Sequence, residues 1–262
     1  MAFETLLYDL QDGIARITLN REKAANAINL QMAKDLMYAA MAADEDASVR
    51  AVVIASQGKM FCAGGDLGTF AKAGDAMPAL VKEMTVYLHA AISHLARMRA
   101  PVLVSVGGTA AGAGFSLVCA GDLALAAESA KFSMAYTQVG LTPDGSSTYF
   151  MPRLIGTRRS LELMLTNRRL SAAEALDWGL VNRVVPDEEL AKATDEWAAA
   201  LASGATSAFG NTKKLVLGSL DQSFEAQMEL ESRAIADASR SDDAAEGISA
   251  FLNKRKADFP GR

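Results

Sequence analysis

One carboxylate closes the stretch AYTQVGLTPDG, residues 135 to 145, which carries no other charge. This residue, Asp144, stands between Pro143 and Gly145, a strong turn signal because proline fixes its own φ and glycine accepts unusual dihedral angles. Asp144 could also be the N-cap of a helix that begins near Ser146. The other interpretation is chemical, since a carboxylate can act as the base for one proton. The stretch alone favours the turn.

Two loops of small residues could present bare backbone amides to a negatively charged oxygen. They are CAGGD, residues 62 to 66, and AAGAG, residues 110 to 114. The first amides of a helix have no intrahelical acceptor, and larger side chains would keep a ligand away from them. Two such donors on one oxygen form an oxyanion hole, in which each donor is worth about 10²–10³ in rate. Alternatively, the small residues only let helices pack closely.

The elements that must hold these loops alternate between strands and helices. TLLYDLQDGIARITLN predicts a hairpin around Asp12-Gly13, and NAINLQMAKDLMYAAMAADED has helical spacing. The buried strand RAVVIASQ leads into the first glycine loop, and a helix from about Met77 to Met98 follows. The buried strand PVLVSV then leads through the glycine turn GGTAAG to the buried helix AGFSLVCAG. Two passes of the chain therefore share one plan: a strand, a glycine-rich loop and a helix.

Composition sets the class of the protein. The chain has 262 residues, half of them hydrophobic, and a net charge of −5, which argues against a nucleic-acid partner. Residues 100 to 121 carry no charge, but Pro101 and several glycines break them up, so we predict soluble core and no membrane span. No linker divides the chain, and long amphipathic segments follow Pro186. We predict an α/β core over residues 1–195 and a helical region over 196–262.

Neither the cysteines nor the N-terminus points to export or to a metal site. Cys62 and Cys119 have neither the spacing of metal ligands nor the density of a secreted disulfide scaffold. The first residues, MAFETLLYDLQDG, have no apolar run of signal-peptide length. We therefore expect a cytoplasmic protein without a bound metal.

Four motifs in their proper order resemble the crotonase superfamily, the enoyl-CoA hydratases and isomerases. They are MFCAGGDLGTF, AAGAGFSLVCAGDLALAAESAKF, VGLTPDGSSTYFMPRLIG and LSAAEALDWGLVNRVV. The resemblance covers essentially the whole chain. It implies a spiral of ββα units, a homotrimer or a hexamer built as a dimer of trimers, and an acyl-CoA thioester as substrate. Coenzyme A would be part of that substrate, and no separate cofactor is expected.

The same resemblance assigns catalytic positions. The two oxyanion-hole amides fall on Ala63 and Ala113, where they would stabilise an enolate as charge develops on the thioester. The two glutamates of the hydratases fall on Ser116 and Tyr136, and neither is a carboxylate. Asp144 falls where isomerases of the family place an aspartate base. Tyr136 could orient Asp144 by a hydrogen bond or only form an aromatic wall of the pocket.

The resemblance also implies a binding site for the coenzyme A portion. Basic side chains would pair with its phosphates, and an aromatic ring would cover the adenine. Alternatively, Lys23, Lys59 and Lys254 are ordinary solvated side chains. Asp66 could instead hold the loop or the start of a helix. The candidate residues are Lys23, Ala24, Lys59, Gly64, Gly65, Asp66, Phe251 and Lys254.

An enoyl-CoA isomerase with Asp144 as its base is the expected activity, because one carboxylate can take a proton from one carbon and return it to another. Three alternatives remain open. The chain could be a hydratase, a weakly active CoA-thioester binding protein, or an enzyme like 4-chlorobenzoyl-CoA dehalogenase. In that last family the nucleophile falls on Asp144, the histidine base on His89 and the indole donor on Tyr136. A histidine in the middle of a helix is more often a core or surface residue. The sequence does not identify the acyl group, whose pocket we expect to involve Phe70 and the helix from Met77.

Overall fold

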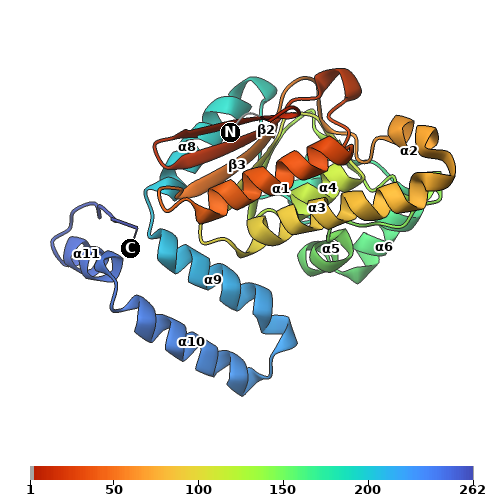
Figure 1. Cartoon of the computed structure of the whole chain (residues 1–262). Helices are drawn as coiled ribbons and strands as arrows, with labels where there is room; N and C mark the ends of the chain where they lie inside the picture. The colour runs from red at the N-terminus through yellow and green to blue at the C-terminus, as the bar shows by residue number, and fades with distance from the viewer. Residues whose placement is uncertain (1–2, 262) are drawn as a thin grey trace.

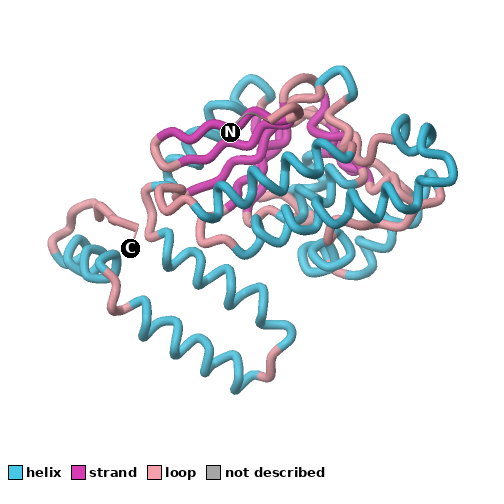
Figure 2. The backbone as a smooth tube through the Cα atoms, viewed as in Figure 1, coloured by secondary structure: helices cyan, strands magenta, loops and turns pink. Residues whose placement is uncertain are grey.

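The computed structural model describes residues 3–261, and within them six strands form the larger of two sheets (Figures 1 and 2). In spatial order these are β1 (Leu6–Gln11), β2 (Ile14–Leu19), β3 (Ala51–Ser56), β5 (Val102–Val106), β7 (Leu123–Ala127) and β10 (Arg183–Val185). β1 and β2 form the antiparallel hairpin that the sequence predicts, and the remaining pairings are parallel. Asp12 and Gly13 join them with positive φ (52° and 75°), as a tight hairpin turn requires.

A smaller sheet lies beside the larger one. Its four strands among the described residues are β4 (Met60–Cys62), β6 (Thr109–Ala111), β8 (Lys131–Ser133) and β9 (Leu170–Ser171). Three times the chain adds a strand to the large sheet, then a strand to the small sheet, and then a helix. The three helices are α2 (Leu67–Ala73), α4 (Ala113–Ala120) and α5 (Ser147–Ile155). The predicted spiral of ββα units is therefore confirmed, although part of the expected turn GGTAAG is strand β6.

Helices cover both faces of the large sheet (Figure 1). They are α1 (Leu30–Glu45) and α3 (Met77–Arg97) on one face and α8 (Leu190–Ala202) on the other. Strand β3 shows the reason, because successive side chains of a strand point to opposite faces. Val52 and Ile54 belong to the main core, whereas Ala51 and Val53 pack in a second cluster that includes Ala198 of α8. Both faces are apolar and must be covered.

The uncharged segment from residue 100 to residue 121 lies in this core. Every residue of β5 and of α4 is buried. No helix in the described part of the chain combines the length and the apolar character that a membrane span needs. The glycines and small residues of the segment allow the close packing of α4 against β6 and β4.

Two short helices, α6 (Thr157–Thr166) and α7 (Ala172–Asp177), complete the core, and three helices extend from it. These three are α9 (Thr206–Gly218), α10 (Phe224–Ala238) and α11 (Asp242–Leu252). α9 contacts α3, α10 pairs with α9, and α11 lies at the far end of the molecule (Figure 1). Residue 195, where we place the boundary of the core, falls inside α8, and the division itself stays a prediction.

Candidate active site

The two glycine-rich loops that the sequence singles out lie against each other. A Cβ atom on Gly64 would lie 3.0 Å from the carbonyl oxygen of Ala111 and 3.3 Å from the amide nitrogen of Ala113. Gly64 also has a φ of 93°, which residues with a side chain rarely adopt. Both the backbone conformation and the close contact therefore require glycine here. The loops converge, which the sequence could not show.

The backbone amides of these loops differ in whether they already have an acceptor. The Ala63 amide donates to the carbonyl oxygen of Ala25 at 3.1 Å, so the expectation that it is free to bind a substrate oxygen is wrong. Within the described residues, the amides of Gly65 and Ala113 donate to no acceptor. Ala113 is the first residue of α4, where an amide has no intrahelical partner. Gly65 and Ala113 therefore each present an amide without an acceptor.

Gly65 and Ala113 line one cavity of about 510 Å³. Its walls are largely apolar and include Phe70 and Met84, in agreement with the prediction that Phe70 and the helix from Met77 form a pocket. Asp144 also lines it and is the one carboxylate among the described lining residues. Two free amides and a single carboxylate thus share a mostly apolar cavity.

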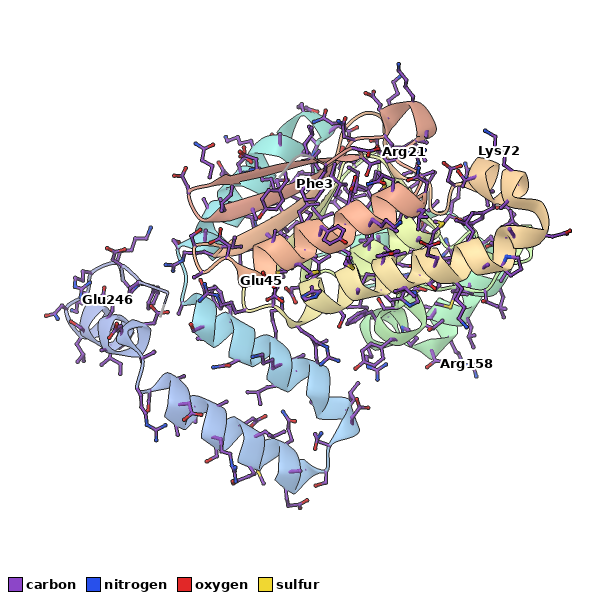
Figure 3. All side chains as sticks on the ribbon, viewed as in Figure 1. Phe3, Arg21, Glu45, Lys72, Arg158 and Glu246 are labelled. Atoms are coloured by element: carbon purple, nitrogen blue, oxygen red, sulfur yellow. The ribbon has the colours of Figure 1, made fainter. Side chains whose placement is uncertain are left out.

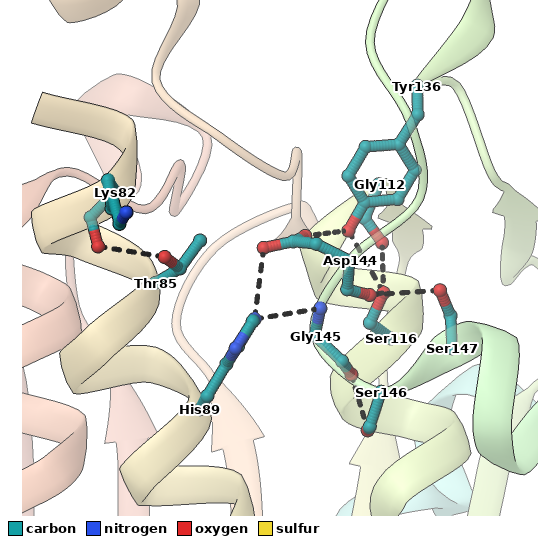
Figure 4. A network of polar contacts seen from close by, with 10 residues as sticks. All are labelled: Lys82, Thr85, His89, Gly112, Ser116, Tyr136, Asp144, Gly145, Ser146 and Ser147. Carbon is teal, nitrogen blue, oxygen red and sulfur yellow. Dashed lines mark hydrogen bonds and ion pairs between the residues drawn. The ribbon is translucent and has the colours of Figure 1, made fainter. Parts of the chain in front are cut away.

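The Asp144 carboxylate is held by Tyr136 (Figure 4). The Tyr136 hydroxyl donates to Oδ1 of Asp144 at 2.6 Å. Ser116, which is fully buried on α4, donates from its Oγ to the main-chain oxygen of Asp144 at 2.9 Å and lies 3.0 Å from the Tyr136 hydroxyl. Sequence reasoning treated Ser116 only as a missing glutamate and overlooked these contacts.

Tyr136 is a hydrogen-bond donor here, not a base. Burial raises the pKa of the Tyr136 hydroxyl well above its usual range, and the neighbouring Asp144 carboxylate raises it further. The hydroxyl therefore keeps its proton near neutral pH and directs it at Oδ1 of Asp144. The geometry agrees with the orienting role considered from the sequence, and Tyr136 also lines the cavity.

The helix-capping interpretation of Asp144 is wrong. Helix α5 begins at Ser147, and the residue before it, Ser146, has a left-handed φ of 67° and makes no side-chain cap. Asp144 supports this turn through its main-chain oxygen, which accepts from the Ser147 amide at 3.2 Å and from the Ser147 hydroxyl at 2.9 Å. The turn is real, but it leaves the Asp144 carboxylate available to the cavity.

His89 reaches the same carboxylate from α3 (Figure 4). Its Nε2 atom lies 3.4 Å from Oδ2 of Asp144 and accepts from the Gly145 amide at 3.3 Å. About half of the imidazole side chain (51%) remains exposed. The dehalogenase resemblance places a histidine at this position, and the structure brings it beside Asp144. His89 is therefore a half-exposed surface residue, as expected in the middle of a helix, and it also contacts Asp144.

The candidate coenzyme A residues near the N-terminus gather beside the first glycine loop. Asn26 donates to the carbonyl oxygens of Gln57 and Met60 at 2.8 Å and 2.9 Å, and thereby ties the segment of Lys23 and Ala24 to the segment of Lys59. Lys23 and Lys59 are exposed. These three candidates thus lie on neighbouring loops.

Asp66 holds the glycine loop in place. One carboxylate oxygen accepts from the Thr69 amide at 3.0 Å and caps α2, and the other pairs with Arg21 at 3.0 Å. Partial burial alone would raise the pKa of Asp66, but the Thr69 amide and Arg21 outweigh it and lower that pKa. Both carboxylate oxygens of Asp66 therefore already have a partner within the loop, which favours the structural interpretation of this residue over direct binding.

Phe251 and Lys254 do not join the other candidates within this chain. Phe251 lies on α11 and is 83% exposed, and Lys254 follows that helix. Glu246 of α11 and Lys72 of α2 mark opposite ends of the molecule in Figure 3. The predicted coenzyme A residues therefore form two separate groups in a single copy of the chain.

Comparison with known proteins decides the family. The family model for enoyl-CoA hydratase/isomerase matches residues 9–262. The chain belongs to the enoyl-CoA hydratase/isomerase family. A Rhodobacter capsulatus protein named "Probable enoyl-CoA hydratase" is 37% identical over all of both chains. The 1,2-epoxyphenylacetyl-CoA isomerase of Escherichia coli is 35% identical over 99% of each chain. The crystal structure of an enoyl-CoA hydratase from Polaromonas sp. JS666 has a TM-score of 0.92 with 30% identity, and covers 96% of this chain and 98% of that one.

Membership in the hydratase/isomerase family makes this chain an enzyme of acyl-CoA chemistry. Its relatives carry both hydratase and isomerase names, so the family alone leaves the reaction open. The side chains in the cavity therefore have to indicate whether hydration or isomerisation is the reaction.

Proposed function

We propose that this chain is an enoyl-CoA isomerase that shifts a double bond along an acyl-CoA thioester with Asp144 as its base. The observation that carries the proposal is the composition of the cavity. The amides of Gly65 and Ala113 are free, and Asp144 is the one carboxylate among the described lining residues. Isomerisation needs one group that removes a proton and returns it elsewhere, and a single carboxylate suffices for that.

In the proposed reaction the thioester oxygen accepts hydrogen bonds from the Gly65 and Ala113 amides. These donors become stronger partners as negative charge develops on the oxygen, so they stabilise the enolate more than the substrate. Asp144 takes the α proton and returns it to the γ carbon. Because Tyr136 donates to Oδ1, the Oδ2 atom is the one that carries the proton.

Hydration is less well supported by the residues present. It requires a group that activates water and another that delivers a proton. Ser116 is fully buried behind the Asp144 turn and already donates to its main chain. Tyr136 keeps its proton because burial raises its pKa. Neither residue replaces the glutamate of a hydratase.

Coenzyme A binding and assembly belong to the same proposal. Lys23, Ala24 and Lys59 would receive the phosphates beside the glycine loop. Phe251 and Lys254 would act in a neighbouring copy within a homotrimer or a dimer of trimers. Support comes from the exposed apolar side chains of the C-terminal helices, because such surfaces are usually covered in an assembly. They include Phe224, Ile235, Ile248 and Phe251.

A panel of acyl-CoA thioesters tests the activity. Purified protein should convert 3-enoyl-CoA to 2-enoyl-CoA, measured by mass spectrometry after chromatographic separation of the isomers. Hydration of crotonyl-CoA at a comparable rate would contradict the proposal. Binding of the panel without turnover would show a thioester-binding protein instead.

A second candidate is dehalogenation, because His89 lies 3.4 Å from Asp144. In that reaction Asp144 would attack an aryl carbon, and His89 would activate the water that releases the product. Chloride release from 4-chlorobenzoyl-CoA, lost in His89→Gln, would favour this reaction over isomerisation.

A further inference from the structure

Two cavities meet at the contact between His89 and Asp144. Asp144 lines the cavity of the free amides, whereas His89 lines a second cavity of about 640 Å³. This second cavity lies between α3, α5 and α9, and Ile92, Phe150 and Leu217 contribute apolar walls from these helices. The 3.4 Å approach of His89 Nε2 to Asp144 Oδ2 is thus a polar connection between the two cavities.

The protons around this contact can be assigned. The Gly145 amide donates to His89 Nε2 at 3.3 Å, so the neutral ring carries its proton on Nδ1 and has a lone pair on Nε2. The Tyr136 hydroxyl donates to Oδ1 of Asp144, which leaves Oδ2 toward the ring. With Asp144 ionised, two acceptors face each other at Oδ2 and Nε2. Once Oδ2 carries a proton, it can donate to Nε2 in place of the Gly145 amide, since Nε2 has a single lone pair. His89 is therefore placed to receive a proton that Asp144 has just taken.

We propose that His89 is a proton shuttle that exchanges the proton held by Asp144 with water in the second cavity. This inference rests on the proposed function, in which Asp144 takes the α proton of the substrate. The Oδ2–H bond breaks as an Nε2–H bond forms, which leaves a carboxylate and an imidazolium. The ring then turns on its side-chain bonds, and Nε2 gives its proton to a water molecule. A second proton, taken from water, returns by the reverse steps, so the balance of protons is zero.

The exposure of the two side chains supports this direction. The Asp144 side chain is 27% exposed and lines the cavity that substrate would fill. The His89 side chain is 51% exposed and borders the other cavity, so a bound substrate leaves it in water with room to turn. The charged groups that share the second cavity are Arg97, Lys214 and Asp221. Arg97 and Lys214 repel an imidazolium and so favour release of its proton, whereas Asp221 and the Asp144 carboxylate favour its retention.

Isomerisation in D₂O tests the shuttle. The wild-type protein should make 2-enoyl-CoA that carries deuterium at the γ carbon, measured by mass spectrometry as label per molecule of product. His89→Gln keeps a polar side chain that can accept from the Gly145 amide, but an amide does not carry protons. We expect its product to contain at least about tenfold less label, because loss of a proton-transfer group slows the transfer by about 10²–10⁴. His94→Gln is the matched control, because His94 lies on the same helix and bonds Asp44 instead, at 2.9 Å. It should label like the wild type.

Each outcome bears on the shuttle or on the proposed function separately. Wild-type product without label, or His89→Gln product with full label, would overturn the shuttle and leave isomerisation intact. If no thioester is isomerised, exchange of the α hydrogens of butyryl-CoA with D₂O becomes the readout. Exchange that His89→Gln slows would keep the shuttle and contradict the isomerase, and no exchange at all would contradict both. If His89→Gln proves insoluble, His89→Asn carries the same test.

Discussion

The Tyr136 hydroxyl donates a 2.6 Å hydrogen bond to the Asp144 carboxylate in the wall of a mostly apolar cavity. A hydrogen bond to a charged group is worth about 1.5–3 kcal/mol. Tyr136→Phe removes this bond and keeps the ring, so we expect kcat to fall about 10- to 150-fold, which corresponds to that energy. Steady-state kinetics with a 3-enoyl-CoA measure it.

A matched tyrosine gives the control for that change. Tyr149 lies on α5 and donates to the carbonyl oxygen of Leu217 at 3.2 Å, away from Asp144. Tyr149→Phe should keep wild-type kinetics. Equal kcat values in the two variants would show that Tyr136 is only a wall of the cavity.

Asp144 itself provides the most direct test of the proposed base. Asp144→Asn keeps the size of the side chain and the main-chain bonds to Ser116 and Ser147, but it cannot take a proton. We expect kcat to fall by about 10²–10⁴, the usual contribution of a general base. The dissociation constant of an acyl-CoA should change little, as measured by calorimetry. Asp177→Asn, at the exposed end of α7, is the control. Full activity in Asp144→Asn would remove the residue from the mechanism.

Local signals in the sequence predicted most of the fold. The Asp12-Gly13 turn, the buried strand from Val102 and the helix from Met77 follow from patterns within a few residues of each other. Gly179, which follows the C-cap Trp178 of α7, has a positive φ of 78°, as glycines at the end of a helix often do. Patterns of this kind depend on neighbours along the chain, which is why they could be predicted.

The parts of the site that the sequence did not give depend on distant segments. The Ala63 amide is lost as a donor because Ala25, far back along the chain, supplies its acceptor. His89 meets Asp144 from a helix 55 residues earlier, and its place on α3 looks like that of any half-exposed residue. No local sequence pattern predicts such contacts, since they form only when the fold brings α3, α4 and the turn at residues 135–145 together.

The close contact of the two glycine loops leads to a prediction about the free amides. In Gly64→Ala the new methyl group would press on the main chain of Ala111 and Ala113, and so displace the Ala113 amide. Loss of one oxyanion donor costs about 10²–10³ in rate. We therefore expect kcat/KM to fall by this amount, measured with the same 3-enoyl-CoA.

Gly74→Ala separates this contact from backbone strain. Gly74 also has a positive φ, 50°, but a Cβ atom there would have nothing within 4 Å. Both substitutions should lower the melting temperature, because a side chain in such a sparsely populated backbone conformation costs about 1–3 kcal/mol. Gly64→Ala alone should lose activity. Similar losses in both variants would mean that strain, and not the position of the Ala113 amide, explains the effect.

The loss of stability at low pH should depend partly on Glu174. The Ser171 amide, which donates to Glu174 at 2.9 Å, and then Arg168 lower the pKa of this carboxyl from 4.5 to about 2. Because the pKa is lower in the folded state, the contribution to stability is complete above the unfolded value and is lost as the pH falls toward about 2. Glu174→Gln should lower the melting temperature near neutral pH and flatten its fall between about pH 5 and pH 2. Scanning calorimetry across this range measures both effects.

The control is Glu188→Gln, which changes an exposed carboxylate in the turn before α8 and should leave the pH profile unchanged. A wild-type slope in Glu174→Gln would show that other carboxylates govern acid unfolding.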